Sequence, residues 1–454
     1  MEETARLMRI ASAWAAYQGQ LPASLKTVPG QINDNVNLNF ARPIVDAGVD
    51  FLFGDDVGFE IQDDMSDNPK ESPGNAYLRE LWTANNKMTT LGDLALNGAV
   101  CGDAFLKVRE PDETHKYPRL IVLDPATVTP IWSADDFTDV LSYVITWNTI
   151  DPYSMQPMVR RQLIERGEAA TGWYITDQVS RGTSKVFTTI AEDVWPFAWA
   201  PVFHCQNLPA PNQYWGTSDL ETDIVDVIRS INFTMSNTNR IIRFHAHPKT
   251  WGSGFAQKDL NTSVDATIVL PNKDAKLVNL EMQSDLGSSI EVYKRFKEAL
   301  HEIASIPEIA TGKVDSAGAL SGVALNILYR PLINKTKKKQ LRYGDMLREL
   351  NRCLLEMGGM SPGSGNLEIH WPNILPVDDF QEAQTAVVLD QLGVSKQTLL
   401  TRLGFDPELE AEKKAAEQKT AMDMGAAMLS QFDKGSLDGQ APPDGVPAGA
   451  PADK

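Results

Sequence analysis

Apolar side chains recur every three or four residues over several long segments, and this spacing predicts amphipathic helices. The clearest segment is residues 219–245, which would form a helix about 40 Å long. One face of this helix is apolar: Leu220, Ile224, Ile228, Ile231, Met235 and Ile242. The other face is polar: Asp226, Arg229, Ser236, Arg240 and Arg243. Ser218 and Glu221 have the spacing of a capping box, which predicts a sharp start.

The same periodicity predicts further helices. They fall at residues 1–20, 39–54, 75–98, 287–304 and about 320–357. Pro43 lies near the first turn of the second, and Gly54 supplies its stop. Pro307 ends the helix at 287–304. Pro331 interrupts the longest helix, so we expect a bend there.

Short runs of β-branched and aromatic residues, separated by Asp, Pro and Gly, predict strands between residues 103 and 190. These runs are DAFLKVRE, RLIVLD, TVTPIW, VLSYVITW, GWYITD and KVFTTI. A Pro- and Asn-rich loop follows at 203–216, a small β-rich insert at 246–286 and one strand at 366–372. Short helices with Gly stops are expected at 377–432, and the Pro/Gly/Ala/Asp-rich residues 433–454 should be disordered. The predicted fold class is therefore α+β.

Composition and charge narrow the function. The 454 residues include 60 acidic and 42 basic side chains, for a formal net charge of −18. A conventional nucleic-acid binder is basic because phosphate contacts supply most of its affinity. The three cysteines are widely spaced without a C-x-x-C pair, which fits a reducing cytoplasm and argues against disulfides or zinc. No apolar run reaches the length of a membrane span, so no membrane partner is expected.

One short segment, residues 330–342, is strongly basic although the chain as a whole is acidic. Six basic residues occur within 13 positions that contain no acid: Arg330, Lys335, Lys337, Lys338, Lys339 and Arg342. They lie on the predicted long helix. A solvated helix surface explains single lysines well. Six together favour contact with phosphate or an ion-pair seam with an acidic neighbouring subunit, and the sequence leaves these two open.

Enzyme motifs are not found. ATGKV at 310–314 lacks the first Gly and the Ser or Thr of a phosphate-binding loop, because Pro307 and Val314 occupy those positions. HEIAS at 301–305 has Ser305 where a zinc protease needs its second His. Paired carboxylates stand in no catalytic setting. We therefore expect no enzyme, no catalytic residue, no metal and no cofactor.

The order of these parts resembles the portal proteins of tailed double-stranded DNA bacteriophages, of the siphophage type. Five stretches carry the likeness, over most of residues 35–405: NFARPIVDAGVDFLFGDDV, ALNGAVCGDAFLKV, LDPATVTPIW, NLPAPNQYWGTSDLETDIVDVIRSIN and SAGALSGVALNILYRPLINKTKKKQLRYGDMLRELN. Each alone is weakly specific, and the ordered set gives the resemblance. It implies a portal fold: a mixed α/β wing, a two-helix stem, a small β-rich clip, a long kinked helix after a tunnel loop, a helical crown and a disordered tail.

The resemblance also implies domain boundaries. The wing would be 1–217, the stem helices 218–245 and 287–304, and the clip 246–286. Residues 305–376 would return to the wing, with the tunnel loop at 311–322 and the long helix at about 320–357. The crown would be 377–432 and the tail 433–454.

Site residues follow from that assignment. Tunnel-loop and DNA-channel candidates are Lys313, Asp315, Ser316, Ser321, Lys335, Lys337, Lys338, Lys339 and Arg342. Stem residues that would face the lumen are Arg229, Arg240 and Arg243. Clip residues that would contact the terminase or an adaptor are Lys249, Trp251, Lys258, Lys273 and Lys276.

The resemblance implies a ring, twelve-fold in the virion, at the portal vertex of the capsid and assembled in the cytoplasm of a bacterial host. Expected partners are further copies of the chain, double-stranded DNA in transit, the terminase large subunit, a head-completion adaptor, and the major capsid and scaffolding proteins. A capsid-associated or scaffolding protein without DNA conduction is the alternative. A hydrolase whose site the sequence does not reveal is a third.

Overall fold

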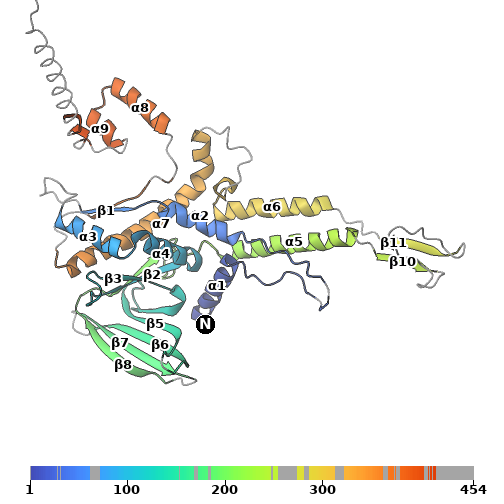
Figure 1. Cartoon of the computed structure of the whole chain (residues 1–454), viewed down its shortest axis with the longest axis horizontal. Helices are drawn as coiled ribbons and strands as arrows, with labels where there is room; N and C mark the ends of the chain where they lie inside the picture. The colour runs from blue at the N-terminus through green and yellow to red at the C-terminus, as the bar shows by residue number, and fades with distance from the viewer. Residues whose placement is uncertain are drawn as a thin grey trace, which may run out of the picture. The chain divides into compact units, whose positions relative to one another are not determined.

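The chain divides into two compact units, Met1–Ile374 and Leu375–Lys454, which are described separately. The computed structural model describes residues 2–27, 29–30, 32–61, 72–152, 154–167, 172–182, 186–246, 249–253, 274–280, 286–311, 322–360, 367–372, 374, 379–402, 407, 410–411 and 413–415. Helices and separate antiparallel sheets make up the first unit, which confirms the α+β prediction (Figure 1).

The helices of the first unit follow the apolar periodicity closely. Their bounds are α1 Glu2–Tyr17, α2 Ala41–Phe53, α3 Pro73–Ala84, α4 Lys87–Cys101, α5 Thr222–Ala246, α6 Leu286–Ala304 and α7 Gly322–Met357. The single helix predicted at 75–98 is wrong, because two helices meet there. Asn86 has a left-handed backbone with φ of 50°, and the Asn85 side chain donates to the carbonyl of Leu81 at 2.9 Å, which ends α3.

Four antiparallel sheets carry the strands. The bounds are β1 Gly58–Ile61, β2 Asp103–Arg109, β3 Arg119–Leu123, β4 Val128–Trp132, β5 Val140–Ile150, β6 Pro157–Arg166, β7 Trp173–Arg181, β8 Thr188–Trp195, β9 Val202–Gln206, β10 Lys249–Ser253, β11 Lys276–Leu280 and β12 Leu367–His370. Their orders are β4-β5-β6-β7-β8, β3-β2-β9, β1-β12 and β10-β11. All six predicted runs between 103 and 190 overlap strands, and the expected β insert contains β10 and β11.

The sequence missed β6, the central strand of the five-stranded sheet. Its residues PMVRRQLIER look too charged for an interior strand. The polar side chains have cross-strand partners: Gln162 donates to Asp177 at 2.7 Å, and Arg161 donates to Gln178 at 2.9 Å. Such pairs stabilise a sheet without an apolar alternation, so a strand rule based on hydrophobicity overlooks it.

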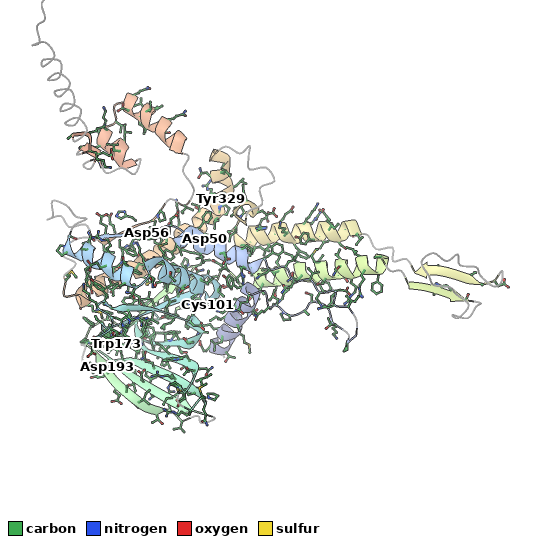
Figure 2. All side chains as sticks on the ribbon, viewed as in Figure 1. Asp50, Asp56, Cys101, Trp173, Asp193 and Tyr329 are labelled. Atoms are coloured by element: carbon green, nitrogen blue, oxygen red, sulfur yellow. The ribbon has the colours of Figure 1, made fainter. Side chains whose placement is uncertain are left out.

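Two hydrophobic clusters hold the first unit together. One joins the sheets to α3, α4 and α7, with Trp82, Phe105 and Tyr343 fully buried. The other joins α1, α2, α4, α5, α6 and α7 around Ile44 and Ile228. The three cysteines are free and buried within these clusters; Cys101 is labelled in Figure 2. Among the described residues, no helix combines the length and the apolarity that crossing a bilayer requires.

The second unit contains two helices in its described part, α8 Asp379–Gln391 and α9 Lys396–Arg402. The Ser395 hydroxyl accepts a hydrogen bond from the Thr398 amide at 3.3 Å, which caps α9. These helices agree with the short helices predicted from 377 onward. The predicted tail, 433–454, lies outside the described residues.

Candidate functional site

Helix α7 carries the basic cluster, and it is continuous through Pro331. Figure 1 shows that the helix turns partway along its length, as an internal proline is expected to cause. Its residues divide into two faces. The inward face is buried: Leu332, Thr336, Lys339, Tyr343 and Leu347. The outward face is exposed: Arg330, Asn334, Lys337, Lys338, Leu341 and Arg342.

Lys335 and Lys339 of α7 form a buried ion cluster with Asp219, which lies at the end of the loop before α5. The Lys335 ammonium is 3.2 Å from one carboxylate oxygen of Asp219, and the Lys339 ammonium donates to the other. Lys339 and Asp219 are 2% and 1% exposed. Burial raises the pKa of Asp219, but the two ammonium groups outweigh it, so the pKa lies below its ordinary value.

Small and polar residues from three other segments enclose this cluster. A β-carbon on Gly48 of α2 would lie 3.1 Å from the Asp219 carboxylate, so α2 passes directly over it. The Asn207 side chain donates to Asp219 at 3.3 Å and to the Thr217 carbonyl at 3.2 Å. Lys335 also donates to the Ala304 carbonyl at 3.0 Å, at the end of α6. The cluster thus joins α7 to α2, α6 and the start of α5.

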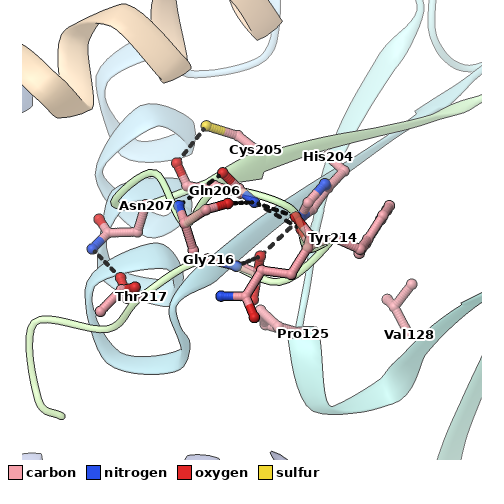
Figure 3. Close-up of polar contacts among 12 residues, drawn as sticks. Pro125, Val128, His204, Cys205, Gln206, Asn207, Tyr214, Gly216 and Thr217 are labelled. Carbon is pink, nitrogen blue, oxygen red and sulfur yellow. Dashed lines mark hydrogen bonds and ion pairs between the residues drawn. The ribbon is translucent and has the colours of Figure 1, made fainter. Parts of the chain in front are cut away.

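The loop before α5 is held rigidly by its own hydrogen bonds (Figure 3). The Gln206 amide donates to the carbonyls of Gln213 and Tyr214 at 3.0 and 3.1 Å. The Gly216 amide donates to the buried Asp103 carboxylate at 2.8 Å, and Asp103 also contacts His204 at 2.8 Å. These contacts fix Asp219 where the lysines of α7 meet it.

The predicted capping box is half right. The Glu221 carboxylate accepts from the Ser218 amide at 3.0 Å. The Ser218 hydroxyl, however, accepts from the Leu220 amide at 2.8 Å and contacts the carbonyls of Ala99 and Val100. It anchors the loop to the end of α4, and α5 begins at Thr222, later than expected.

The expectation that Lys335 and Lys339 contact DNA is corrected. Both ammonium groups are satisfied inside the chain by Asp219, and burial removes Lys339 from any external phosphate. The sequence offered no signal for this pairing, because Asp219 lies more than a hundred residues before the lysines. The two alternatives for these residues, DNA or a neighbouring subunit, therefore give way to a third partner, which is a carboxylate of the same chain.

The outward face keeps its charge unpaired. Lys337, Lys338 and Arg342 are exposed, and no ion pair to them occurs among the described residues. The next turns of α7 differ, because Arg348 pairs with Asp345 at 2.6 Å and Arg352 pairs with Glu349 at 2.6 Å. The helix balances its charges in its second half, whereas in its first half four basic side chains, including Arg330, have no acidic partner among the residues that the structure describes.

The tunnel-loop candidates Lys313, Asp315, Ser316 and Ser321 lie outside the described residues. So do Lys258 and Lys273 of the expected clip. Lys249 lies in β10, and Lys276 is exposed in β11. Trp251 is exposed and stands opposite Val278, which is also exposed, in the antiparallel pair of β10 and β11.

The three arginines that were expected to line the stem make contacts within the same chain. Arg240 and Arg243 lie 3.3 and 2.5 Å from the buried Asp34 carboxylate. Arg229 pairs with Asp226 at 2.7 Å and donates to the Ser12 hydroxyl at 3.1 Å. Their side chains remain partly exposed, so part of each guanidinium faces outward.

Two predictions for α5 are wrong, and the segment at 34–38 explains the first of them. Ser236, expected on the polar outer face, is buried because the Val36 amide donates to its hydroxyl at 2.9 Å. The Leu38 amide donates to Asn232 at 2.9 Å in the same way. Ile242, expected on the buried stripe, is 50% exposed. We call residues 34–38 the N-terminal strap.

Nothing among the described residues suggests catalysis. They contain no group of His, Cys, Asp or Glu that could hold a metal ion. Two pockets, of about 480 and 410 Å³, lie at the start of α4 and beside β1. Neither is lined by a residue of the predicted sites.

Comparison with known proteins identifies the family. The model of the phage portal protein family, SPP1 Gp6-like, matches residues 2–424. A search of curated proteins found no match. Among solved structures, a chain from the neck of a native GTA particle, computed with C12 symmetry, is 12% identical over 81% of this chain and 91% of that chain, with a TM-score of 0.48. Since the family model covers nearly the whole sequence, the chain belongs to the SPP1 Gp6-like family of phage portal proteins, which are structural and non-enzymatic components of the phage particle.

Proposed function

We propose that this portal protein forms a closed ring, of twelve copies in the virion, at the unique vertex of the capsid. DNA enters through the ring during packaging by the terminase and leaves through it at ejection, and head-completion proteins attach to it. The observation that carries this proposal is the family match over residues 2–424. Assembly in the cytoplasm of a bacterial host, with major capsid and scaffolding proteins, belongs to the same proposal.

The arrangement of α5 and α6 supports the assignment of stem and clip. The two helices pack against each other, and β10 and β11 lie between them in the chain (Figure 1). Residues 218–304 thus form a helical hairpin with a small β tip, which is the arrangement expected of a stem that carries a clip. The resemblance to phage portal proteins, and not the hairpin, is the basis on which we assign residues 1–217 and 305–376 to the wing and 377–432 to the crown.

The channel wall is proposed to be largely acidic. Each phosphate that is neutralised by Lys or Arg releases counterions and tightens binding, so a basic wall would hold the DNA. The chain carries a net charge of −18. Sparse basic or polar groups in the tunnel loop, including Lys313 and Ser316, would then centre the DNA without retaining it.

Electron microscopy of the purified protein and of capsids tests the proposal. We expect rings with a central hole, and capsids that lack this protein should package no DNA. Protein that stays monomeric at every salt concentration and is absent from the capsid vertex would rule the portal role out. Particles that contain it in a scaffold without a channel would instead support a capsid-associated protein that does not conduct DNA.

A further inference from the structure

The outward face of α7 has the composition of a protein interface more than of a phosphate site. Its unpaired basic residues alternate with exposed apolar ones: Leu341 is 66% exposed and Ile327 is 67% exposed. DNA phosphates need cations and gain nothing from leucine or isoleucine. A mixed apolar and basic face instead fits a protein surface that is apolar and acidic.

Lys338 and Arg342 lie along one edge of this exposed face. They are four residues apart, so they project from the same side of α7 one turn apart, about 6 Å along the axis. Like charges at this spacing repel each other and destabilise an isolated helix. An acidic partner that reaches both side chains would remove this repulsion.

Helix α6 carries a surface with the opposite charge at the same spacing. Glu298 and Glu302 are exposed, lie four residues apart, and have no ion pair among the described residues. Ile303 beside them is 46% exposed. The first half of α6 differs, since Glu291 there pairs with Arg295 at 3.2 Å.

The two surfaces lie in one chain but do not pair within it. Lys335 reaches the end of α6 through the Ala304 carbonyl. Lys338 and Arg342 lie on the same side of α7, three and seven residues later, but both side chains are exposed and no ion pair joins them to Glu298 or Glu302 among the described residues. Each surface is therefore available to another molecule.

We propose that Lys338, Arg342 and Leu341 of one subunit dock on Glu298, Glu302 and Ile303 of a second copy of this chain. A closed ring needs a head-to-tail contact between two different, complementary surfaces. These two surfaces match in charge, in spacing and in their apolar neighbour. The inference rests on the proposed ring and deepens it, because it assigns the basic cluster to subunit contact and not to DNA.

Charge reversal in two separate full-length variants tests this contact. Lys338→Glu with Arg342→Glu makes both surfaces acidic, and Glu298→Lys with Glu302→Lys makes both basic. For each variant alone, the yield of assembled rings should fall by about tenfold or more, because like charges would then lie opposite each other at every subunit contact. Lys26→Glu with Arg119→Glu is the matched control, since both residues are exposed and lie outside α6 and α7. Circular dichroism and thermal melting check that every monomer is folded.

Mixing the two variants gives the decisive measurement. In an alternating ring, every contact between the variants pairs opposite charges again, either in the original or in the exchanged sense. An equimolar mixture should therefore recover rings with an even number of subunits, counted by native mass spectrometry. Ring formation by the wild type should also weaken between about 0.1 and 1 M salt.

Several results would overturn the inference. They are normal ring yield for either variant alone, or no recovery in the mixture although both monomers are folded. Normal rings of the Lys338→Glu, Arg342→Glu variant that package less DNA would assign the basic face to DNA. In all these cases the wild type still forms rings, so the proposed function stands. Failure of the wild type itself to form rings would count against the proposed function.

Discussion

At the residue scale, the buried cluster of Asp219, Lys335 and Lys339 is the most consequential feature. Two cations and one carboxylate lie where α7, α2, α6 and the start of α5 meet. A buried ion pair adds little stability relative to well-packed apolar residues, but breaking one by removing a single partner is costly. The cluster therefore fixes the register between α7 and the loop before α5.

Replacing Asp219 with Asn should lower the free energy of unfolding by about 3–5 kcal/mol, since it leaves buried ammonium groups without a counter-charge. Adding Lys339→Met should recover much of this loss, because the most buried ammonium is then replaced by an apolar side chain of similar size. Urea unfolding at neutral pH measures both. Equal stability of the Asp219→Asn variant and the wild type would show that the cluster contributes nothing.

The same variant has a predicted pH dependence. The pKa of Asp219 is lowered by folding, so the stabilisation is complete above the unfolded pKa of about 3.9 and is lost as the pH falls through the folded value. The difference in stability between the wild type and the Asp219→Asn variant should thus be constant from pH 7 to about 5 and shrink only below about pH 4. A difference that shrinks already near neutral pH would contradict this assignment.

At the element scale, the second half of α5 is held by the N-terminal strap. Backbone amides of Val36 and Leu38 donate to Ser236 and Asn232, and Asn239 donates to the Asp34 carbonyl at 3.2 Å. An extended segment has no internal hydrogen bonds, so these side chains supply the partners that its backbone requires. The polar side chains of Asn232, Ser236 and Asn239 therefore hold the strap on α5.

Ser236→Val tests the strap. Removal of the hydroxyl leaves the Val36 amide without its acceptor, which should cost about 1–3 kcal/mol. Hydrogen exchange should rise at Val36 and Leu38 and stay unchanged in the five-stranded sheet. Asn237→Ala, at an exposed position of the same helix, is the control and should leave both amides protected. Unchanged exchange in Ser236→Val would mean that the strap is held by other contacts.

At the scale of the whole molecule, the buried apolar residues of the described chain lie almost entirely in the first unit. Both hydrophobic clusters consist of residues from the first unit, and in the described part of the second unit Leu399 is the only buried apolar side chain. Burial of apolar area is the main favourable term in folding. The first unit should therefore fold without the second.

A chain ending at Ile374 tests this. We expect it to express as a folded monomer whose melting temperature matches the main transition of the full chain within about 2 °C, because a change of 1 kcal/mol would already shift it by a similar amount. Differential scanning calorimetry makes the comparison. A large fall in the melting temperature would show that residues after 374 stabilise the first unit.

The sequence by itself determined most elements and their order. Apolar periodicity located α2, α5, α6 and α7, and the β-branched runs located six of the strands, since these patterns depend on which face of each element meets the core. The ordered motifs also gave the portal family, which the family model confirms. The hydrophobic pattern did not predict β6, because polar cross-strand pairs stabilise that strand. It also did not predict the break between α3 and α4, because the left-handed backbone of Asn86 does not change the spacing of apolar residues.

Only the tertiary structure decided which charged residues are free. Lys335, Lys337, Lys338 and Lys339 look alike along the sequence, yet the helical turn places two of them against Asp219 and two outward. Asp34 likewise pairs with arginines some two hundred residues away. An ion pair depends on distance in space, and residues so far apart in sequence come together only when the core has fixed the positions of their helices.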